Sequence, residues 1–430
     1  MAWRHQRRRA AGEVVRAPSL RFRALRRGGS LPAVQAAPRL VYVVTHPVSA
    51  DVLLRGQLAF MRERGFEVTL VTSPGTELER VCAREGIRCV PVQMARPIRP
   101  LHDARALAEL TRVLARIRPD IINASTPKGG LLGSMAARAL RVPVRIYLLR
   151  GLRLETTRGA LRAVLSMTER AASACADEVV CVSSSLRDAA VAGGHIPAGK
   201  ASVLGEGSSN GVDTARFART EERVELGRQL LARHGIRDED EVVGFVGRLD
   251  PDKGIGDLLD AVERVRARRP HVKLVLIGAG FGGDHDEPLA ARIRALPWAV
   301  TYGKSDDLAP LYARMNVLAF PSYREGFPNV PLEAACAEVP CVAYRATGSV
   351  DAVVSGVTGA IVPLGDVSSL AGELETYLSE GERRLAHGRA ARERAVRSFS
   401  REIVWARWEE HYRARLDRAT TERMSPRATA

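Results

Sequence analysis

Short apolar runs rich in Val, Ile and Leu alternate with longer segments of helical periodicity along most of this chain. A continuous apolar run bounded by Gly, Pro or charged residues is typical of a strand that is buried on both faces. Strands of this kind that alternate with helices form parallel sheets covered by helices on both sides. The runs that we interpret as strands begin at residues 39, 67, 87, 120, 145, 178, 242, 272, 300, 317, 341 and 359.

The alternation runs through the chain twice, which predicts two Rossmann-like, doubly wound α/β domains. A length of 430 residues is enough for two cores, and 46% hydrophobic residues indicate a packed globular protein. The Gly- and Ser-rich residues 205–211 have the composition of a linker. We expect residues 39–200 to form the first domain, 201–395 the second, 396–417 a C-terminal helix and 418–430 a disordered tail.

The N-terminal arm, residues 1–38, differs in composition from the rest of the chain. Ten arginines and one acid, Glu13, precede Leu40, and they supply +9 of the net charge of +16. Together with its Pro and Gly residues, this composition predicts disorder. Two interpretations stay open, namely a basic arm that contacts anionic lipid and a solvated tail.

Several classes of protein are disfavoured by composition. No run of 18 uninterrupted apolar residues is present, so we expect no membrane-spanning segment. Aromatic residues make up 5%, which argues against a stacking platform for single-stranded nucleic acid, and we expect no nucleic-acid partner. The cysteines at 82, 89, 175, 181, 336 and 341 form no C-x-x-C pair, and we interpret them as free packing residues in a reducing compartment.

The stretch Glu325-Gly-Phe-Pro-Asn-Val-Pro-Leu-Glu333 follows a predicted strand and runs into a predicted helix. The first turn of a helix has free amides and a positive dipole end, so it binds phosphate. We expect the amides of Asn329 and Val330 to do so, because a proline cannot donate. The two carboxylates are suited to accept hydrogen bonds from sugar hydroxyls. Phosphate at the amides and sugar at the acids predict a nucleotide-sugar site.

A second loop of the same domain carries two cations. Gly247-Arg248-Leu-Asp-Pro-Asp-Lys253 lies between a β-rich run and a segment of helical periodicity. Arg offers a planar fork and Lys a compact point charge, and both suit a diphosphate. We therefore predict that Arg248 and Lys253 bind the donor diphosphate and stabilise the charge that develops as the nucleotide leaves.

These motifs together resemble the signature of family-4 retaining glycosyltransferases with the GT-B fold. Gly247-Arg248…Lys253-Gly254 is followed by Glu325-x7-Glu333, in the order found in that family. Further motifs resemble a bacterial subgroup that extends lipid-linked sugars for capsule, O-antigen or glycoprotein assembly. They are Ser125-Thr-Pro-Lys-Gly-Gly-Leu-Leu-Gly133, Arg150-Gly-Leu-Arg-Leu-Glu-Thr and Gly207-Ser-Ser-Asn-Gly-Val-Asp213.

The resemblance implies two Rossmann-like domains facing a central cleft, with the C-terminal helix crossing back to the first domain. It implies transfer with retention of a hexose or N-acetylhexosamine from a nucleotide sugar, with UDP the favoured carrier, to a glycan on a polyprenyl diphosphate. Glu333 would accept from the ribose hydroxyls, Glu325 from the donor sugar, and residues 303–306, Gly303 and Asp306 included, would meet the base. No bound metal or other cofactor is implied, and Asp284-His-Asp-Glu287 is interpreted as a solvated loop.

The first domain departs from the wider family. Many members have a Gly-Gly pair after the first strand, where this chain has His46-Pro-Val-Ser, and many have His where this chain has Arg150. Arg150 stays charged and cannot act as a general base. Together with Lys128 at a predicted helix start and Arg153, it could bind the diphosphate of the acceptor. The alternative that stays open is a solvated basic face.

An enzyme that extends lipid-linked glycans would work as a peripheral protein on the inner face of the cytoplasmic membrane. Two other functions remain as alternatives. One is a relative with the same fold that acts as a sugar-nucleotide epimerase or a phosphorylase. The other is a non-catalytic basic protein that binds membrane or nucleic acid through its arm.

Overall fold

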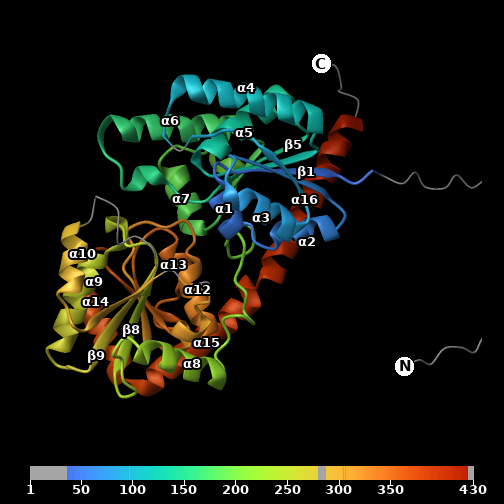
Figure 1. Ribbon diagram of the computed structural model, residues 1–430. Coiled ribbons are helices and arrows are strands. Elements are labelled where there is room, and N and C mark those ends of the chain that lie inside the picture. The colour runs from blue at the N-terminus through green and yellow to red at the C-terminus, as the bar shows by residue number, and fades with distance from the viewer. Residues whose placement is uncertain (1–35, 96, 279–286, 304, 306, 425–430) are drawn as a thin grey trace, which may run out of the picture. The chain divides into compact units, whose positions relative to one another are not determined.

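The computed structural model describes residues 36–95, 97–278, 287–303, 305 and 307–424 (Figure 1). Most of the N-terminal arm lies outside these residues, as do Asp306 and most of the segment 284–287. The described residues from Ala37 onward group into one compact unit. It contains two parallel sheets, so the chain adopts the GT-B arrangement of two Rossmann-like domains.

The first sheet has seven strands among the described residues, in the order β3-β2-β1-β4-β5-β6-β7. The strands are β1 (Arg39–Val43), β2 (Glu67–Thr72), β3 (Arg88–Pro91), β4 (Ile121–Ser125), β5 (Val144–Leu149), β6 (Glu178–Cys181) and β7 (Ala201–Ser202). The helices are α1 (Pro47–Leu53), α2 (Gln57–Glu63), α3 (Thr76–Glu85), α4 (Pro100–Ile117), α5 (Pro127–Ala139), η1 (Arg153–Glu155), α6 (Gly159–Cys175), α7 (Ser184–Ala192) and η2 (Ala198–Lys200). Because β7 pairs with β6, this sheet extends just past the boundary predicted at residue 200.

The second sheet has six strands among the described residues, in the order β10-β9-β8-β11-β12-β13. The strands are β8 (Glu241–Val246), β9 (Val272–Ile277), β10 (Ala299–Tyr302), β11 (Val317–Phe320), β12 (Cys341–Tyr344) and β13 (Gly359–Val362). The helices are α8 (Glu221–Ala232), η3 (Pro251–Lys253), α9 (Ile255–Arg266), α10 (Glu287–Arg294), α11 (Ala309–Arg314), α12 (Asn329–Cys336), α13 (Ser349–Ala352), α14 (Val367–Ser379), α15 (Gly381–Phe399) and α16 (Arg401–Met424).

Both faces of each sheet are buried, as continuous apolar strands require. In β1, Leu40 and Tyr42 point into one hydrophobic cluster, whereas Val41 and Val43 point into a second cluster on the opposite face. Two further clusters cover the faces of the second sheet. In each sheet the strand order reverses at one place, between β1 and β4 and between β8 and β11. Ligands of open α/β sheets bind at such switch points, beyond the carboxyl ends of the strands.

The last helix, α16, belongs by packing to the first domain. It lies against α2 and β5, and its red ribbon in Figure 1 runs beside the blue β1. The Tyr412 hydroxyl accepts a hydrogen bond from Asn123 of β4 at 2.7 Å and donates one to Tyr42 of β1 at 3.1 Å. The helix continues through the predicted tail to Met424, because Leu416 and Ala419 pack on the same core as Trp408.

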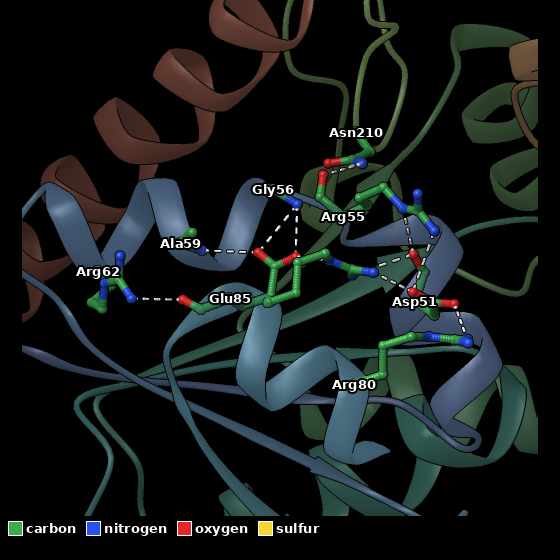
Figure 2. Close-up of polar contacts among 9 residues, drawn as sticks. Asp51, Arg55, Gly56, Ala59, Arg62, Arg80, Glu85 and Asn210 are labelled. Atoms are coloured by element: carbon green, nitrogen blue, oxygen red, sulfur yellow. Dashed lines mark hydrogen bonds and ion pairs between the residues drawn. The ribbon is translucent and has the colours of Figure 1, made fainter. Parts of the chain in front are cut away.

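A polar network ties together the helices beside the carboxyl end of β1 (Figure 2). Glu85, 1% exposed at the end of α3, accepts from the amides of Gly56 and Ala59 and so caps the start of α2. Asp51 of α1 is paired with Arg80 at 2.7 Å and with Arg84. The network holds α1 and α2 in place on α3.

Local predictions failed at further places. Residues 47–53 form helix α1 instead of a loop, because Pro47 occupies its first turn and the ring of His46 accepts from the amide of Val48 at 3.3 Å. Helix α6 was not predicted. Cys82 and Cys89 form a disulfide, which contradicts the expectation of free cysteines, because the end of α3 and the start of β3 bring their Cα atoms to 6.0 Å. Within the described ranges, no helix is both long and apolar enough to cross a bilayer.

Candidate active site

The two predicted donor loops meet at the switch point of the second sheet. The first follows β8 and includes η3, and the second follows β11 and leads into α12. Gly254 has a φ of +66°, and a Cβ atom there would lie 2.2 Å from the carbonyl oxygen of Pro321. Only glycine allows this backbone conformation together with this close approach. The fold therefore packs the Lys253 loop directly on the Glu325 loop.

Lys253 and Glu325 form an ion pair between these loops. The ammonium of Lys253 contacts Oε1 of Glu325, and the two side chains are 17% and 14% exposed. The same carboxylate oxygen accepts a hydrogen bond from the Ser322 hydroxyl at 2.7 Å. The structure thus brings together the predicted phosphate-binding cation and the predicted sugar-binding acid, with each holding the other in place.

Arg248 is placed differently from Lys253. Its side chain is 72% exposed and pairs with Asp250 at 2.6 Å. An exposed ion pair of this kind stabilises a protein by about 0–1 kcal/mol. Arg248 can therefore exchange Asp250 for a phosphate at little cost. Gly247 precedes Arg248. The carbonyl oxygen of Gly247 lies against Gly278, just after β9.

Helix α12 begins at Asn329, and in the described part of the chain its N-cap residue, Pro328, forms no side-chain capping hydrogen bond. The amides of Asn329 and Val330 lie in this uncapped first turn, where an anion is favoured. Glu333, one turn further on, is half-buried and accepts a hydrogen bond from the Tyr312 hydroxyl at 2.7 Å. Burial raises the pKa of Glu333, while the Tyr312 hydrogen bond opposes this effect.

Of the two residues predicted to meet the base, Gly303 is exposed at the end of β10, and Asp306 lies outside the described residues.

A pocket of about 370 Å³ opens at the switch point of the first sheet, beyond the ends of β1 and β4. Its wall is largely apolar and also includes polar side chains. Its lining residues are Thr45, His46, Ser49, Ile98, Asp103, Thr126, Pro127, Lys128, Leu131, Leu132, Arg153, Leu165 and Thr168. Two of the three predicted acceptor residues, Lys128 and Arg153, therefore line one cavity.

Some polar groups of this pocket are already bound by the protein itself. Lys128 is paired with Asp103 at 2.6 Å and donates to the carbonyl of Pro97 at 2.5 Å. The hydroxyl of Thr45 accepts from the amide of Gly129 in the first turn of α5. Arg153, by contrast, is exposed on the pocket wall. We therefore regard Arg153 as the readier ligand for an anionic group.

Arg150 does not line this pocket. Its three guanidinium nitrogens are buried and have no hydrogen-bond partner among the described residues. Burial lowers its pKa to about 10, and the nearby hydroxyls of Tyr412 and Tyr42 partly oppose that shift. Its guanidinium thus lies within the first domain, near Tyr42 and Tyr412, apart from the pocket that Lys128 and Arg153 share.

The loop of Glu325 touches the first domain at Gly326. A Cβ atom at Gly326 would lie 1.8 Å from the carbonyl oxygen of Arg150, and its own carbonyl accepts from the Ser183 hydroxyl at 2.7 Å. Gly348 packs against the backbone of Glu325 and Gly326 in the same loop. The ends of β5 and β6 therefore adjoin the predicted sugar-binding acid.

Glu155 is a site residue that the sequence prediction missed. It lies in η1, and its Oε1 accepts from the Thr347 hydroxyl of the second domain at 2.8 Å. Its Oε2 is buried with no hydrogen-bond partner among the described residues, and burial raises its pKa. The only signal in the sequence is an acid within a cluster of arginines. Because Arg153 lies in the same short helix, η1 connects the pocket to the loops beside Gly326.

Family models match most of the chain in two parts. Residues 50–207 match a glycosyl transferase 4-like domain, and residues 228–394 match glycosyl transferases group 1. The capsular polysaccharide biosynthesis glycosyltransferase CapM of Staphylococcus aureus is 34% identical over 361 residues, which cover 84% of this chain and 93% of CapM. An Escherichia coli enzyme, UDP-Gal:alpha-D-GlcNAc-diphosphoundecaprenol alpha-1,3-galactosyltransferase, is 26% identical over 64% of this chain and 70% of its own length.

Solved structures share the fold. Anabaena HepE in complex with UDP and glucose superimposes with a TM-score of 0.73 at 21% identity, covering 88% of this chain and 100% of HepE. WaaG, a glycosyltransferase involved in lipopolysaccharide biosynthesis, superimposes with a TM-score of 0.64 at 15% identity over 87% of this chain and 99% of WaaG.

Proposed function

The chain belongs to the glycosyltransferases of the GT-B fold, and on that premise we propose that it transfers a hexose or N-acetylhexosamine from a UDP-sugar to a glycan on a polyprenyl diphosphate. The product would enter capsular or another cell-surface polysaccharide. Support comes from the described role of CapM and from the donor and acceptor named for the Escherichia coli relative. HepE, which shares the fold, binds UDP and glucose.

One observation carries the proposal most directly. Helix η1 has Arg153 on the wall of the first-domain pocket and Glu155 bonded to Thr347 beside the Glu325 loop. An acceptor whose diphosphate met Arg153 would therefore extend its sugar toward Glu325. The apolar wall of the pocket suits the lipid part of such an acceptor.

Five donor-side residues then have a role in the transfer. The amides of Asn329 and Val330 bind the diphosphate, and Lys253 neutralises the charge that grows on it as the sugar leaves. Glu325, held by Lys253, accepts from hydroxyls of the donor sugar. Glu333 has one oxygen bonded to Tyr312 and offers the other to the ribose hydroxyls.

We assign retention of configuration to the reaction. A double-displacement mechanism needs a carboxylate nucleophile about 5 Å from its acid partner. Lys253 and Ser322 both contact Oε1 of Glu325, and we assign its other oxygen to hydroxyls of the donor sugar, so this carboxylate is not the nucleophile in our proposal. We therefore favour attack on the face from which UDP departs, with the departing phosphate taking the acceptor proton. The protein positions both substrates and stabilises charge.

The first test is slow hydrolysis of the donor. The full chain is incubated with a panel of UDP- and GDP-sugars, and release of nucleotide and sugar is measured. Lys253→Ala should lower the rate by about 30-fold or more, because one preorganised charge is lost. Lys273→Ala, on β9 at the opposite end of the sheet, is the matched control. Equal rates for both variants would refute the donor site, and release of an epimerised UDP-sugar would favour the epimerase alternative.

A second test addresses the acceptor. With a polyprenyl-diphosphate glycan, Arg153→Ala and Lys128→Ala should raise KM by about tenfold to 100-fold, the range for hydrogen bonds to charged groups. Both variants should hydrolyse the donor as the wild type does. Equal use of an uncharged soluble glycan would contradict the lipid-diphosphate acceptor, and loss of donor hydrolysis would contradict the assignment of the two residues.

A lipid-linked acceptor would place the enzyme on the inner face of the cytoplasmic membrane. The N-terminal arm could contribute basic residues to such a contact, and its residues 1–35 lie outside the described part of the chain. Deletion of residues 1–38 should then weaken vesicle binding and its dependence on salt. Unchanged binding would leave the arm as a solvated tail.

A further inference from the structure

The two donor loops are paired at two successive positions. Lys253 and Glu325 form the first ion pair. The residue before each of them forms the second, in which Arg324 contacts Asp252 at 3.0 Å. The backbone carbonyl of Asp252 also accepts a hydrogen bond from the amide of Tyr323 at 2.9 Å. The second pair therefore holds the same two stretches of backbone as the first.

A hydroxyl of the first domain lies against this second pair. Thr156 directly follows η1, and its Oγ1 accepts a hydrogen bond from Nε of Arg324 at 3.2 Å. The same hydroxyl donates to Oδ2 of Asp252 at 3.5 Å. One hydroxyl can donate and accept at once, so serine could make both contacts and valine could make neither. We call Thr156, Asp252 and Arg324 the loop clamp.

The segment that carries Thr156 also reaches the first-domain pocket. Arg153, at the start of η1, lines that pocket, and Glu155 accepts from the Thr347 hydroxyl of the second domain. Burial raises the pKa of Glu155, while the Thr347 hydrogen bond and the charge of Arg324 oppose this rise. Arg324 therefore acts on two neighbouring residues of the first domain. Within four residues, this segment contacts the pocket, Thr347 and both donor loops.

Resting on the proposed function, we infer that the loop clamp is a positioning device, in which Thr156 and Arg324 align the donor loops with η1. The acceptor held at Arg153 then meets the donor sugar at Glu325. Transfer needs reacting atoms about 3–3.5 Å apart, and a misplacement of about 1 Å costs a large part of the rate. Water is small and reaches the donor without such alignment. The loop clamp therefore favours transfer to the glycan over hydrolysis of the donor.

A purely structural role is the alternative for these residues. Arg324 is 23% exposed and Asp252 44%, and an ion pair with this exposure contributes little to the stability of a fold. Loss of a purely structural contact would slow transfer and hydrolysis alike, because it would not affect how the acceptor meets the donor. The two roles therefore differ in one measurable quantity, the ratio of the rate of transfer to the rate of donor hydrolysis.

Substitution of Thr156 tests the positioning role. The full chain is assayed with a polyprenyl-diphosphate glycan and the UDP-sugar that the wild type hydrolyses fastest. Thr156→Val should lower the ratio of transfer kcat to hydrolysis kcat about fivefold, the effect of one lost hydrogen bond, whereas Thr156→Ser should keep the wild-type ratio. Affinity for UDP, measured by calorimetry, should not change, because the donor loops stay paired with each other. The matched control is Thr420→Val, an exposed threonine of α16 whose hydroxyl donates to its own helix.

Arg324→Ala should lower the same ratio at least as far as Thr156→Val does. The double variant should match Arg324→Ala alone, because both substitutions remove one shared contact. Multiplied losses in the double variant, a wild-type ratio in Thr156→Val, or an equal loss in Thr156→Ser would each overturn the inference. Thr156 is exposed, so its variants should unfold at the wild-type temperature. Absence of hydrolysis and transfer in the wild type would refute the proposed function and the inference with it, and this outcome is seen before any variant is made.

Discussion

Glu169 is expected to make the protein less stable as the pH rises. This carboxyl group, 8% exposed on α6, accepts a hydrogen bond from the Tyr147 hydroxyl at 2.7 Å. Burial raises its pKa from 4.5 to about 7, and the Tyr147 hydrogen bond only partly opposes that rise. Between these values the folded protein keeps a proton that the unfolded chain has lost.

The sign of the effect follows from proton binding. The folded state holds more protons than the unfolded state between pH 4.5 and about 7, so the free energy of unfolding falls as the pH rises through this window. Each pKa unit corresponds to about 1.4 kcal/mol, so a shift of about 2.5 units costs about 3 kcal/mol above pH 7. At pH 5 the same relation gives a cost of about 1 kcal/mol.

Glu169→Gln should remove this cost, because an amide stays neutral and its oxygen can still accept from Tyr147. Urea unfolding followed by tryptophan fluorescence at pH 5 and pH 8 measures the effect. The variant should gain about 2 kcal/mol more over the wild type at pH 8 than at pH 5. Glu382→Gln, an exposed acid of α15, is the control and should show no such difference. An equal change at both pH values, or a larger gain at pH 5, would refute the reasoning.

Three other predictions concern the loops and the disulfide. Gly326→Ala should lower transfer activity by about 100-fold while nucleotide binding persists, because its Cβ atom would meet the carbonyl of Arg150 and displace Glu325; wild-type turnover would contradict this. Glu155→Gln should change the dependence of kcat on pH, because burial raises the pKa of this acid above its usual range, and an unchanged pH profile would assign it a structural role only. Reduction of the Cys82–Cys89 bridge should lower stability by about 2 kcal/mol, and Cys89→Ser should abolish that response in urea unfolding.

The parts of the fold that follow from local pattern could be predicted from the sequence. Each strand of both sheets except the two-residue β7 appears as an apolar run, and the order of the two donor motifs places Lys253 and Glu325 after β8 and β11. These strands are neighbours because the sheet reverses between them. The meeting of the two loops therefore follows from general rules of α/β sheets.

Partners that lie far apart in the chain could not be predicted in this way. Asp103 pairs with Lys128 across 25 residues, and Thr347 bonds Glu155 across 192 residues. No spacing rule identifies such pairs, because they depend on how loops from different strands meet. The burial of Arg150 could not be predicted for the same reason, because it results from packing near Tyr42 and Tyr412. A cationic residue after a strand gives no sign of whether it faces a pocket or the interior.

The attachment of α16 has a consequence for synthesis on the ribosome. The strands of the first sheet end with β7 at Ser202, whereas the helix that carries Trp408 and Tyr412 begins at Arg401, about 200 residues later. At about 5–20 residues per second, the ribosome needs some 10–40 seconds to make that interval. During this interval, the sides of Tyr42 and Asn123 that Tyr412 will cover remain exposed on the nascent chain. The second domain can fold within this interval, so the first domain to emerge is the last to be completed, and its uncovered face is a natural target for a chaperone.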